Sequence, residues 1–239
     1  MKAIILAAGR GTRISKITKK KPKCLINIKG KSILSRQISF LKKLKINKII
    51  VIRGYKKKFI NYKNIKYIDN KDFKKNEQLG SLLHAKSEFN DDMLISFSDI
   101  IYDFKVLKKI FHSRNGEIIL GIDKKWKKRY EFRYDHPYQQ ADKIQLGKKN
   151  EVLKIGKSLK LKKTEAEFLG ILKLTKKGCK IFMKNYLKIS KKKIKKMQIH
   201  DYLNFLIKRN IKINSCNIKG KFMEIDTYND FKLAKKMFH

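Results

Sequence analysis

Cysteine, proline and acidic residues are all scarce in this 239-residue chain, and each shortage narrows what the protein can be. The three cysteines, Cys24, Cys179 and Cys216, are widely spaced and odd in number. That arrangement argues against a disulfide framework and against a cysteine-rich zinc site. The two prolines, Pro22 and Pro137, lie far apart and form no linker. We therefore expect one domain without disulfides.

Long apolar runs are also absent. No run approaches the roughly 18 residues that a membrane-spanning helix needs. Met1–Ala8 is mostly apolar, but Arg10 and Arg13 follow at once, so no secretory signal peptide is expected. These absences predict a cytoplasmic protein without a membrane span. Hydrophobic residues still make up 42% of the chain, which is enough to build a core and to exclude long disorder.

The charge is strongly positive, with 62 basic residues against 20 acidic ones. Such a charge is typical of proteins that bind nucleic acid. Only eight of the basic residues are arginine, however, and specific readers of phosphates and bases favour the bidentate guanidinium. We interpret the excess as a solvated lysine coat, supplied by AT-rich codons, that would help polyanionic small substrates approach. No specific nucleic-acid partner is expected, and a lysine-rich nucleic-acid-binding protein is the alternative from another class.

Strand and helix patterns alternate along the first half of the chain. Short apolar runs typical of buried strands are separated by segments with apolar residues at helical spacing. The expected strands are Lys2–Ala8, Lys48–Arg53, Ile65–Ile68, Met93–Phe97 and Glu117–Ile122, and the expected helices are Ile33–Leu44, Ser81–Phe89 and Phe104–Phe111. This alternation predicts the α/β class, with a mostly parallel sheet covered by helices on both faces.

The second half is less regular. Lys124–Lys143 is polar and aromatic and has no clean period. After it we expect a hairpin at Ile144–Ile155, a strand at Phe168–Leu174, an extended stretch at Ile211–Asp226, and helices at Gly178–Leu187, Ile199–Ile207 and Tyr228–Phe238. One α/β domain with an inserted, substrate-facing segment is the simplest interpretation.

A loop of small residues follows the first strand, where Leu6–Arg13 has the sequence LAAGRGTR. Such a loop lets backbone N–H groups approach phosphate oxygens closely, and Arg10, Arg13 and Lys23 would add positive charge. Two generic motifs do not fit. The dinucleotide fingerprint would need a glycine at Ile14, and a P-loop would need a Gly-Lys-Ser/Thr end. Taken alone, the loop could equally be a plain tight turn.

With Pro22-Lys23-Cys24-Leu25, the loop resembles the opening of the sugar-nucleotide pyrophosphorylase-like nucleotidyltransferases, which share an LAAGxGxR…PKxL pattern. Four further blocks match in order, namely Asn76–Leu82, Ser98-Asp99, Glu167–Ile171 and Glu224-Ile225-Asp226. The third is similar to a middle block of the small choline-phosphate and phosphonate cytidylyltransferases. The chain is identified as a member of this superfamily. The resemblance implies a single three-layer domain with a mixed, mostly parallel sheet.

The resemblance also implies a reaction. A phosphate or phosphonate oxygen of the acceptor attacks the α-phosphorus of a nucleoside triphosphate, and pyrophosphate leaves. Both reactants are anions, so the site must neutralise charge and align them, without an enzyme nucleophile. Asp99 and Asp226 would hold Mg²⁺, with Lys23 and Arg13 as the catalytic cations. Capping or solvated aspartates and exposed surface cations are the alternatives. Asp230 is expected to cap a helix or to be solvated.

The expected nucleotide-binding residues come from the glycine loop and from the Asn76–Leu82 block. They are Leu6, Ala7, Ala8, Gly9, Gly11, Thr12, Asn76 and Ser81. Asn76 and Ser81 could read the base and the ribose by hydrogen bonds, although Asn76 could instead be a turn residue. Cys24 is expected to be a buried structural thiol.

The expected acceptor-binding residues lie mostly in Asp123–Lys143, which holds the only tryptophan. Trp126, Tyr130 and Arg133 recur at three- and four-residue spacing, so on a helix they would share one face. That face could stack on a small cationic group while Arg133 and Lys143 hold a phosphonate, and Glu167 completes the set. The alternative is that these side chains simply cover the sheet.

The segment is similar to the cytidylyltransferases of phosphonate biosynthesis, with Gln140 and Asp142 as departures from the acidic pattern expected there. The leading interpretation is a Mg²⁺-dependent cytidylyltransferase that transfers CMP from CTP to a small phosphonate or phosphate monoester resembling 2-aminoethylphosphonate. The alternatives are a phosphocholine or other head-group cytidylyltransferase and a sugar 1-phosphate nucleotidyltransferase. Residues 1–124 would form the nucleotide-binding half and 125–239 the acceptor-binding half of one domain, with a homodimer left open.

Overall fold

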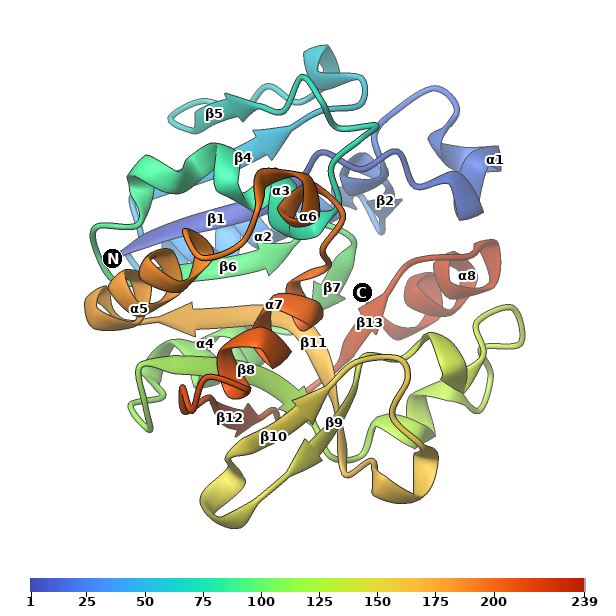
Figure 1. Cartoon of the computed structure of the whole chain (residues 1–239). Helices are drawn as coiled ribbons and strands as arrows, with labels where there is room; N and C mark the ends of the chain where they lie inside the picture. The colour runs from blue at the N-terminus through green and yellow to red at the C-terminus, as the bar shows by residue number, and fades with distance from the viewer. Residues whose placement is uncertain (239) are drawn as a thin grey trace.

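The alternating patterns fold into one nine-stranded sheet between two layers of helices, in a computed structural model that describes residues 1–238 (Figure 1). Its strands are β1 (Lys2–Ala7), β4 (Lys48–Arg53), β5 (Lys66–Asp69), β6 (Met93–Phe97), β8 (Ile118–Asp123), β9 (Lys143–Leu146), β10 (Val152–Ile155), β11 (Ala166–Leu174) and β12 (Asn214–Asn217). The order is β10-β9-β11-β6-β1-β4-β5, and β8 joins β11 to β12. β6, β1, β4 and β5 are parallel neighbours, whereas β11 runs antiparallel to its neighbours. The predicted fold class is confirmed.

Helices cover both faces of this sheet. They are α1 (Ser15–Thr18), α2 (Ile33–Lys43), α3 (Gln78–Leu82), α4 (Phe104–His112), α5 (Lys176–Tyr186), α6 (Lys191–Lys195), α7 (Ile199–Ile207) and α8 (Tyr228–Met237). Figure 1 shows α2 and α4 behind the sheet and α5, α6 and α7 in front of it. The start of α2 is fixed by a local cap, in which the Ser32 hydroxyl accepts a hydrogen bond from Ser35 N at 3.0 Å. None of the helices in residues 1–238 is long and apolar enough to cross a membrane.

Two segments differ from the expected pattern. The helix expected at Ser81–Phe89 ends at Leu82 and continues as 3-10 turns, because the backbone leaves helical angles at Ala85. The segment Lys124–Lys143 contains only two short 3-10 turns, at Trp126–Tyr130 and Tyr138–Gln140. The shared helical face expected for this segment is therefore wrong.

A second, smaller core holds two remote parts of the chain together. The two-stranded ribbon of β7 (Ile100–Tyr102) and β13 (Phe222–Glu224) pairs Glu224 with Ile100. Its apolar face packs with α8 in a cluster made of Ile14, Ile26, Ile28, Ile33, Ile101, Met223, Ile225, Ala234 and Phe238. Because β7 directly follows Asp99 and β13 lies just before Asp226, this ribbon fixes the two aspartates relative to each other.

The three cysteines are free and buried. Burial raises the pKa of the Cys24 thiol to about 12, so this side chain is neutral and packs as a small apolar group.

Candidate active site

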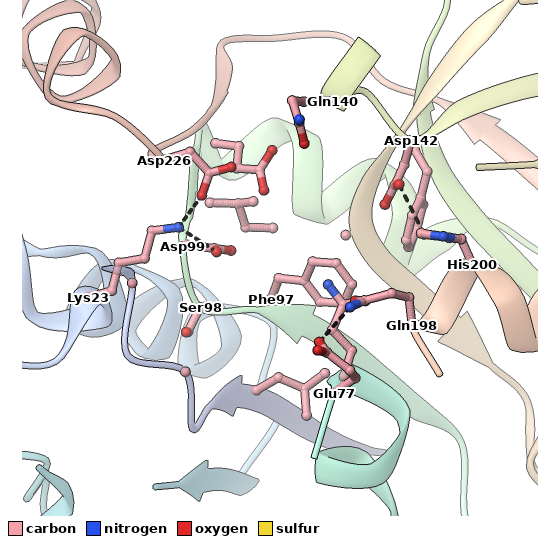
Figure 2. A pocket seen from close by; sticks show the side chains of 18 of the residues that line it. Lys23, Glu77, Phe97, Ser98, Asp99, Gln140, Asp142, Gln198, His200 and Asp226 are labelled. Carbon is pink, nitrogen blue, oxygen red and sulfur yellow. Dashed lines mark hydrogen bonds and ion pairs between the residues drawn. The ribbon is translucent and has the colours of Figure 1, made fainter. Parts of the chain in front are cut away.

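A cavity of about 380 Å³ opens at the carboxyl ends of β1 and β6 (Figure 2). Ligands of open α/β sheets bind at this edge. Thirteen of the seventeen predicted site residues line it: Leu6, Ala8, Gly9, Gly11, Thr12, Arg13, Lys23, Asn76, Ser81, Asp99, Arg133, Glu167 and Asp226. Ala7, Trp126, Tyr130 and Lys143 do not. Residues from both halves of the chain therefore meet in one cavity.

The glycine loop is shaped around Lys23. Gly11 has a left-handed backbone, with φ at 67°, and a β-carbon there would come within 3.0 Å of the Lys23 side chain. The Thr18 hydroxyl donates to the Gly11 carbonyl at 2.8 Å and holds the turn from below. Around Gly9, by contrast, no atom lies within 4 Å of an added β-carbon. The loop thus packs closely against the lysine and leaves its other side open to the cavity.

Asp99 is held by a buried amide on the neighbouring helix. Gln37 of α2 is 2% exposed, and its Nε2 donates to the carbonyls of Phe97 and Ile100, at 2.9 and 2.8 Å. These two bonds clamp the turn that carries Asp99. The Asp99 carbonyl also accepts from Ile225 N at 2.9 Å. The position of the Asp99 carboxylate is therefore set by α2 on one side and by the segment before Asp226 on the other.

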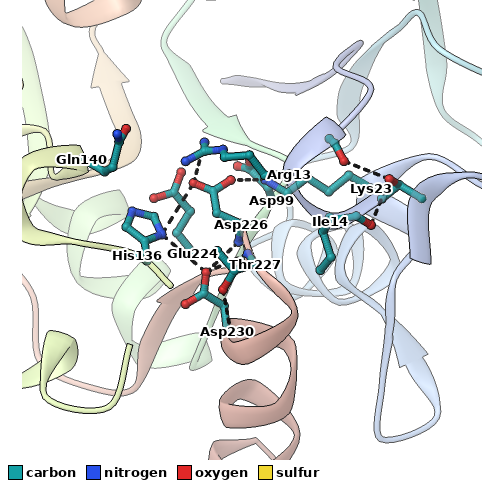
Figure 3. Close-up of polar contacts among 12 residues, drawn as sticks. Arg13, Ile14, Lys23, Asp99, His136, Gln140, Glu224, Asp226, Thr227 and Asp230 are labelled. Atoms are coloured by element: carbon teal, nitrogen blue, oxygen red, sulfur yellow. Dashed lines mark hydrogen bonds and ion pairs between the residues drawn. The ribbon is translucent and has the colours of Figure 1, made fainter. Parts of the chain in front are cut away.

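Asp226 precedes the capped end of α8. Thr227 and Asp230 form a capping box, in which the Thr227 hydroxyl accepts from Asp230 N. The Asp230 carboxylate accepts from the backbone N–H groups of Asp226 and Thr227, each at 2.9 Å (Figure 3). The capping role expected for Asp230 is confirmed. The helix start thereby points the Asp226 side chain into the cavity.

Lys23 lies between the two aspartates. Its Nζ is 2.8 Å from Asp99 Oδ2 and 2.5 Å from Asp226 Oδ1, and Arg13 reaches Asp226 Oδ2 at 2.7 Å. Burial alone would lower the pKa of Lys23, but the two carboxylates outweigh it and raise that pKa. For Asp226, burial would raise the pKa, while Lys23 and Arg13 lower it overall. Both shifts keep Lys23 and Asp226 charged near neutral pH.

Glu224 adds a third carboxylate that the sequence interpretation missed. It is two residues from Asp226 at the end of β13, and within residues 1–238 its side chain has no hydrogen bond or ion pair. Burial, followed by repulsion from Asp226 and Asp99, raises the pKa of Glu224 well above the usual value. In addition, Asp99 Oδ1 is buried without a hydrogen-bond partner. Glu224 and Asp226, together with His136, have ligand atoms within 4.8 Å of one another. Carboxylates offer the oxygen ligands that Mg²⁺ prefers, so Glu224 and Asp226 fit such an ion, with Asp99 beside them across Lys23.

Arg133 lines the cavity beside these carboxylates, but most of its contacts are within the protein. Its Nε donates to Asp230 Oδ1 at 2.7 Å, and its Nη2 reaches His136 Nδ1 at 2.7 Å and the Glu224 carbonyl at 3.1 Å. Arg133 is 5% exposed, His136 2% and Asp230 0%. The pKa of Asp230 is lowered, since hydrogen bonds from His136 and Arg133 outweigh its burial. The Nε and Nη2 of Arg133 are thus engaged within the protein, so most of the guanidinium does not serve the acceptor contact expected from the sequence, and only Nη1 is left for it.

The expected aromatic face for the acceptor is also wrong. Trp126 and Tyr130 are 1% and 6% exposed and form a small core with Ala141. Tyr130 stacks on Tyr138 with ring centroids 5.1 Å apart, and its hydroxyl donates to Glu167. These rings pack on each other because the segment is not a helix and folds back as turns. Buried in this way, Trp126 and Tyr130 offer no open ring face to a cation.

The remaining two predicted residues outside the cavity are buried as well. Lys143 is 2% exposed, and its Nζ contacts the Gln139 carbonyl at 3.4 Å. Burial lowers the pKa of Lys143. The side chain of Ala7, at the end of β1, lies in the main core. Glu167 does line the cavity, but its carboxylate is occupied by Arg129 and Tyr130.

Asn76 and Ser81 belong to one hydrogen-bonded network. Asn76 Nδ2 donates to Asn70 Oδ1 at 3.1 Å, and Asn70 Nδ2 donates to the Ser81 hydroxyl at 2.9 Å. Asn76 Oδ1 is buried without a partner. A buried acceptor without a donor is costly, so this oxygen is suited to receive a donor from a ligand in the cavity.

Asp142, Lys157 and His200 also line the cavity. The sequence interpretation did not assign them to the site. Lys157 follows β10, and His200 lies in the first turn of α7. In a chain with 62 basic residues, a single lysine such as Lys157 cannot be recognised as a site residue from the sequence. The i, i+2 spacing of Glu224 and Asp226 at a strand end, by contrast, could have identified Glu224, because alternate strand residues share a face.

One relative resembles this chain over nearly its whole length, and another over part of it. It is 27% identical over 251 residues to a CTP:phosphoglutamine cytidylyltransferase of Campylobacter jejuni, covering 98% of both chains. A choline-phosphate cytidylyltransferase of Streptococcus pneumoniae is 49% identical over 67 residues, 28% of this chain and 29% of that protein. Among solved structures, the inositol-1-phosphate CTP transferase of T. maritima matches with a TM-score of 0.81 at 19% identity, covering 99% of this chain and 94% of the other. The last similarity concerns the fold.

The family model described as MobA-like NTP transferase domain matches residues 3–130, which is more than half of the chain. The matched range contains the glycine loop, Lys23 and Asp99, and these residues meet in the cavity. The chain therefore belongs to the family of nucleotidyltransferases with a MobA-like NTP transferase domain.

Proposed function

We propose that the protein transfers CMP from CTP to the phosphate of a small phosphorylated acceptor and releases pyrophosphate. The observation that carries the proposal is Lys23 between Asp99 and Asp226, at 2.8 and 2.5 Å, beside the open face of the glycine loop. An acceptor oxygen would form a bond to the α-phosphorus as the bond to the β-phosphate oxygen breaks. Positioning and charge neutralisation supply the catalysis of such a transfer.

Asp99, Glu224 and Asp226 would hold Mg²⁺, which when bound neutralises phosphate charge and helps to align the reacting groups. Lys23 and Arg13 would add positive charge along the triphosphate. The backbone of the glycine loop, together with Thr12, would approach the phosphates closely. Residues 1–124 would thus supply most of the nucleotide site. Residues 125–239 would supply the acceptor site and two of the metal carboxylates.

The choice of CTP is supported by Asn76. Its Oδ1 is buried without a donor, and the exocyclic amine of cytosine is a donor, whereas uracil has a carbonyl at that position. A buried site that is built for a donor rejects the analogue lacking it, because both acceptors would stay unpaired. The Campylobacter jejuni and Streptococcus pneumoniae relatives, whose names describe cytidylyltransferases, agree with this choice.

The acceptor phosphate would bind Lys157. Four basic side chains line the cavity. Arg13 and Lys23 are engaged with the metal carboxylates, and Arg133 is occupied by Asp230. Lys157 is exposed, and its one recorded side-chain contact is to Gln140 Oε1 at 3.4 Å. A phosphonate presents the same dianionic oxygens as a phosphate monoester, so a 2-aminoethylphosphonate-like compound is the second candidate acceptor.

A pyrophosphate-release panel tests the proposal. Four nucleoside triphosphates are combined, with Mg²⁺, with phosphoglutamine, phosphocholine, phosphoethanolamine, 2-aminoethylphosphonate, inositol 1-phosphate and sugar 1-phosphates. We expect release with CTP and a nitrogen-bearing phosphate ester or phosphoramidate, and an Asn76→Leu variant should lose most of the preference for CTP over UTP. Faster release from UTP or dTTP with glucose 1-phosphate would overturn the proposal of cytidylyl transfer.

A further inference from the structure

Asp142 and His200 form a pair on the side of the cavity opposite Lys23 (Figure 2). Asp142 directly precedes β9, and His200 lies in the first turn of α7. His200 Nδ1 is 3.0 Å from Asp142 Oδ1. No hydrogen bond or ion pair within residues 1–238 reaches Asp142 Oδ2. The pair therefore presents one carboxylate oxygen that can still accept a hydrogen bond.

Asn204 attaches the hairpin of β9 and β10 to α7 without the help of His200. Asn204 of α7 accepts from Ile155 N at 3.0 Å and donates to the Ile155 carbonyl, which fixes β10 to the helix. The ring of His200 also packs on the backbone of Gly156, where an added β-carbon would be 3.3 Å from the imidazole. His200 is thus held in one orientation and can in turn orient Asp142. This ion pair is not needed to dock the two elements.

Two other carboxylates outside the metal group, Glu77 and Glu167, also line the cavity, and each has a partner within the protein. Glu167 accepts from Arg129 and Tyr130, and Glu77 accepts from Gln198 Nε2 at 2.6 Å. Glu77 is likewise contacted at one oxygen only, but by an amide and at an exposed position. Asp142 differs in that its one partner is the imidazole of His200 and its side chain is only 17% exposed, toward the cavity. An acidic group kept in a cavity by a chain of net charge +42 favours a ligand with a cationic or hydrogen-bond-donating end.

A quaternary ammonium group would leave the free oxygen of Asp142 without a hydrogen bond. It has no N–H to donate and is normally bound against aromatic faces. The aromatic residues of the acceptor segment, Trp126, Tyr130 and Tyr138, pack on one another instead, with centroids 5.1 to 5.8 Å apart. The free oxygen of Asp142 can accept from an N–H donor, and a primary ammonium or a carboxamide supplies one; a charged ammonium would also match the carboxylate charge.

We propose that Asp142, oriented by His200, is a specificity-determining residue that accepts a hydrogen bond from an N–H group at the end of the acceptor remote from its phosphate. The acceptor class is then a phosphorylated small molecule with a primary ammonium or a carboxamide. The inference rests on the proposed function and adds the identity of the group that is read. Asp142 is the contact residue, and His200 is a positioning residue.

A methylation series tests this inference. The kcat/KM with CTP and Mg²⁺ is measured for phosphoethanolamine, its N-methyl and N,N-dimethyl derivatives, and phosphocholine, with phosphoglutamine as the carboxamide arm. We expect kcat/KM to fall at least about tenfold from the primary to the quaternary amine. Asp142→Asn should raise KM for the primary amine about tenfold with little change in kcat, and should flatten the series. His200→Gln should have a smaller effect in the same direction. Asp135→Asn, at an exposed position, is the matched control.

The outcomes separate the two proposals. Phosphocholine used as well as phosphoethanolamine, or an Asp142→Asn variant with the wild-type series, would overturn the role of Asp142 while CMP transfer stands. Turnover of sugar 1-phosphates, and of no acceptor with an amine or amide, would also overturn the role of Asp142 while CMP transfer stands. If CTP releases no pyrophosphate with any acceptor while the folded protein still binds CTP, the proposed function fails, and the inference fails with it.

Discussion

Charged side chains at this site act in pairs, and the pairing decides which of them remain available to a ligand. Lys23, Asp99 and Asp226 hold one another in the cavity, whereas Arg133 is tied up by Asp230. From the sequence alone, each of these residues could either face a ligand or form an ion pair within the protein. The motif around Pro22-Lys23 was specific enough to identify the first group. For Arg133, whose partner is 97 residues away, local spacing carried no such information.

Removing one metal carboxylate should abolish most of the activity. We expect Asp99→Asn or Asp226→Asn to reduce turnover by at least about 100-fold, because metal-held charge neutralisation contributes several kcal/mol to the transition state. The measurement is single-turnover kinetics at saturating CTP and Mg²⁺, with the fluorescence of the buried Trp126 as the check on folding. Asp135→Asn serves as the control. A folded variant with activity near that of the wild type would remove that aspartate from the metal site.

The Asp142–His200 pair should make stability depend on pH. The pKa of His200 is raised: burial would lower it, but the hydrogen bond and charge of Asp142 and the charge of Asp201 outweigh both burial and the nearby Lys157. A raised folded-state pKa stabilises the protein below the unfolded value of about 6.5, and this stabilisation is lost as pH rises through the folded pKa. His200→Gln should therefore cost more free energy of unfolding at pH 6 than at pH 9.

Urea denaturation followed by Trp126 fluorescence measures this difference. The Asp142→Asn variant is the matched comparison, because it removes the main cause of the raised pKa and should make the His200→Gln cost nearly independent of pH. An equal cost of His200→Gln at both pH values in the wild-type background would contradict a charged pair.

At the scale of elements, prediction succeeded where the apolar period was regular. Met93–Phe97 and Ile199–Ile207 have the predicted bounds as β6 and α7, because a buried run and a one-sided apolar face each permit only one regular structure. Lys124–Lys143 has no such period. Its turns are held mainly by remote partners, since Arg129 reaches Glu167 as well as the nearby Asp123, and Arg133 reaches Asp230. Tertiary ion pairs override spacing there, so a helical face was predicted where none exists.

That segment is thereby coupled to the start of α8. Arg133 holds the Glu224 carbonyl and the Asp230 carboxylate, and Asp230 caps Asp226 N. We expect Arg133→Lys to raise the Mg²⁺ concentration for half-maximal rate several-fold and to leave the acceptor KM unchanged, because lysine cannot reproduce the forked contacts. Titration of Mn²⁺ followed by electron paramagnetic resonance gives the same information without turnover. Lys154→Arg, on the exposed face of β10, is the control. A raised acceptor KM with unchanged metal affinity would instead return Arg133 to the acceptor site.

At the scale of the whole molecule, the charge balance of the cavity is opposite to that of the chain. The chain has 62 basic and 20 acidic residues, yet six acidic side chains line the cavity against four basic ones. Composition could therefore predict the surface but not the site, because the few acids gather where a cation and a donor-bearing acceptor would bind. The two halves of the chain share one sheet, which explains why residues from both meet in the cavity. β11 is inserted between β6 and β8, so the cavity needs both halves of the chain, as the ordered motifs implied.

The lysine coat should act on the approach of CTP and not on the chemical step. Magnesium-bound CTP is an anion, and a positive surface raises its local concentration in a way that salt screens, with a Debye length of about 10 Å at 0.1 M. Between about 25 and 300 mM KCl at fixed free Mg²⁺, kcat/KM for CTP should fall several-fold while kcat stays nearly constant.

A polyanion separates steering from a dedicated nucleic-acid site. Duplex DNA binds any dense lysine surface in a salt-sensitive manner, with counterions released in proportion to the phosphates contacted. At 150 mM salt we expect such binding to leave kcat at saturating CTP unchanged, since the cavity is rimmed by acidic residues that a phosphate backbone avoids. Tight duplex binding that persists at 300 mM salt, together with a salt-independent kcat/KM for CTP, would contradict the steering interpretation. It would favour a protein whose surface, and not its cavity, carries the function.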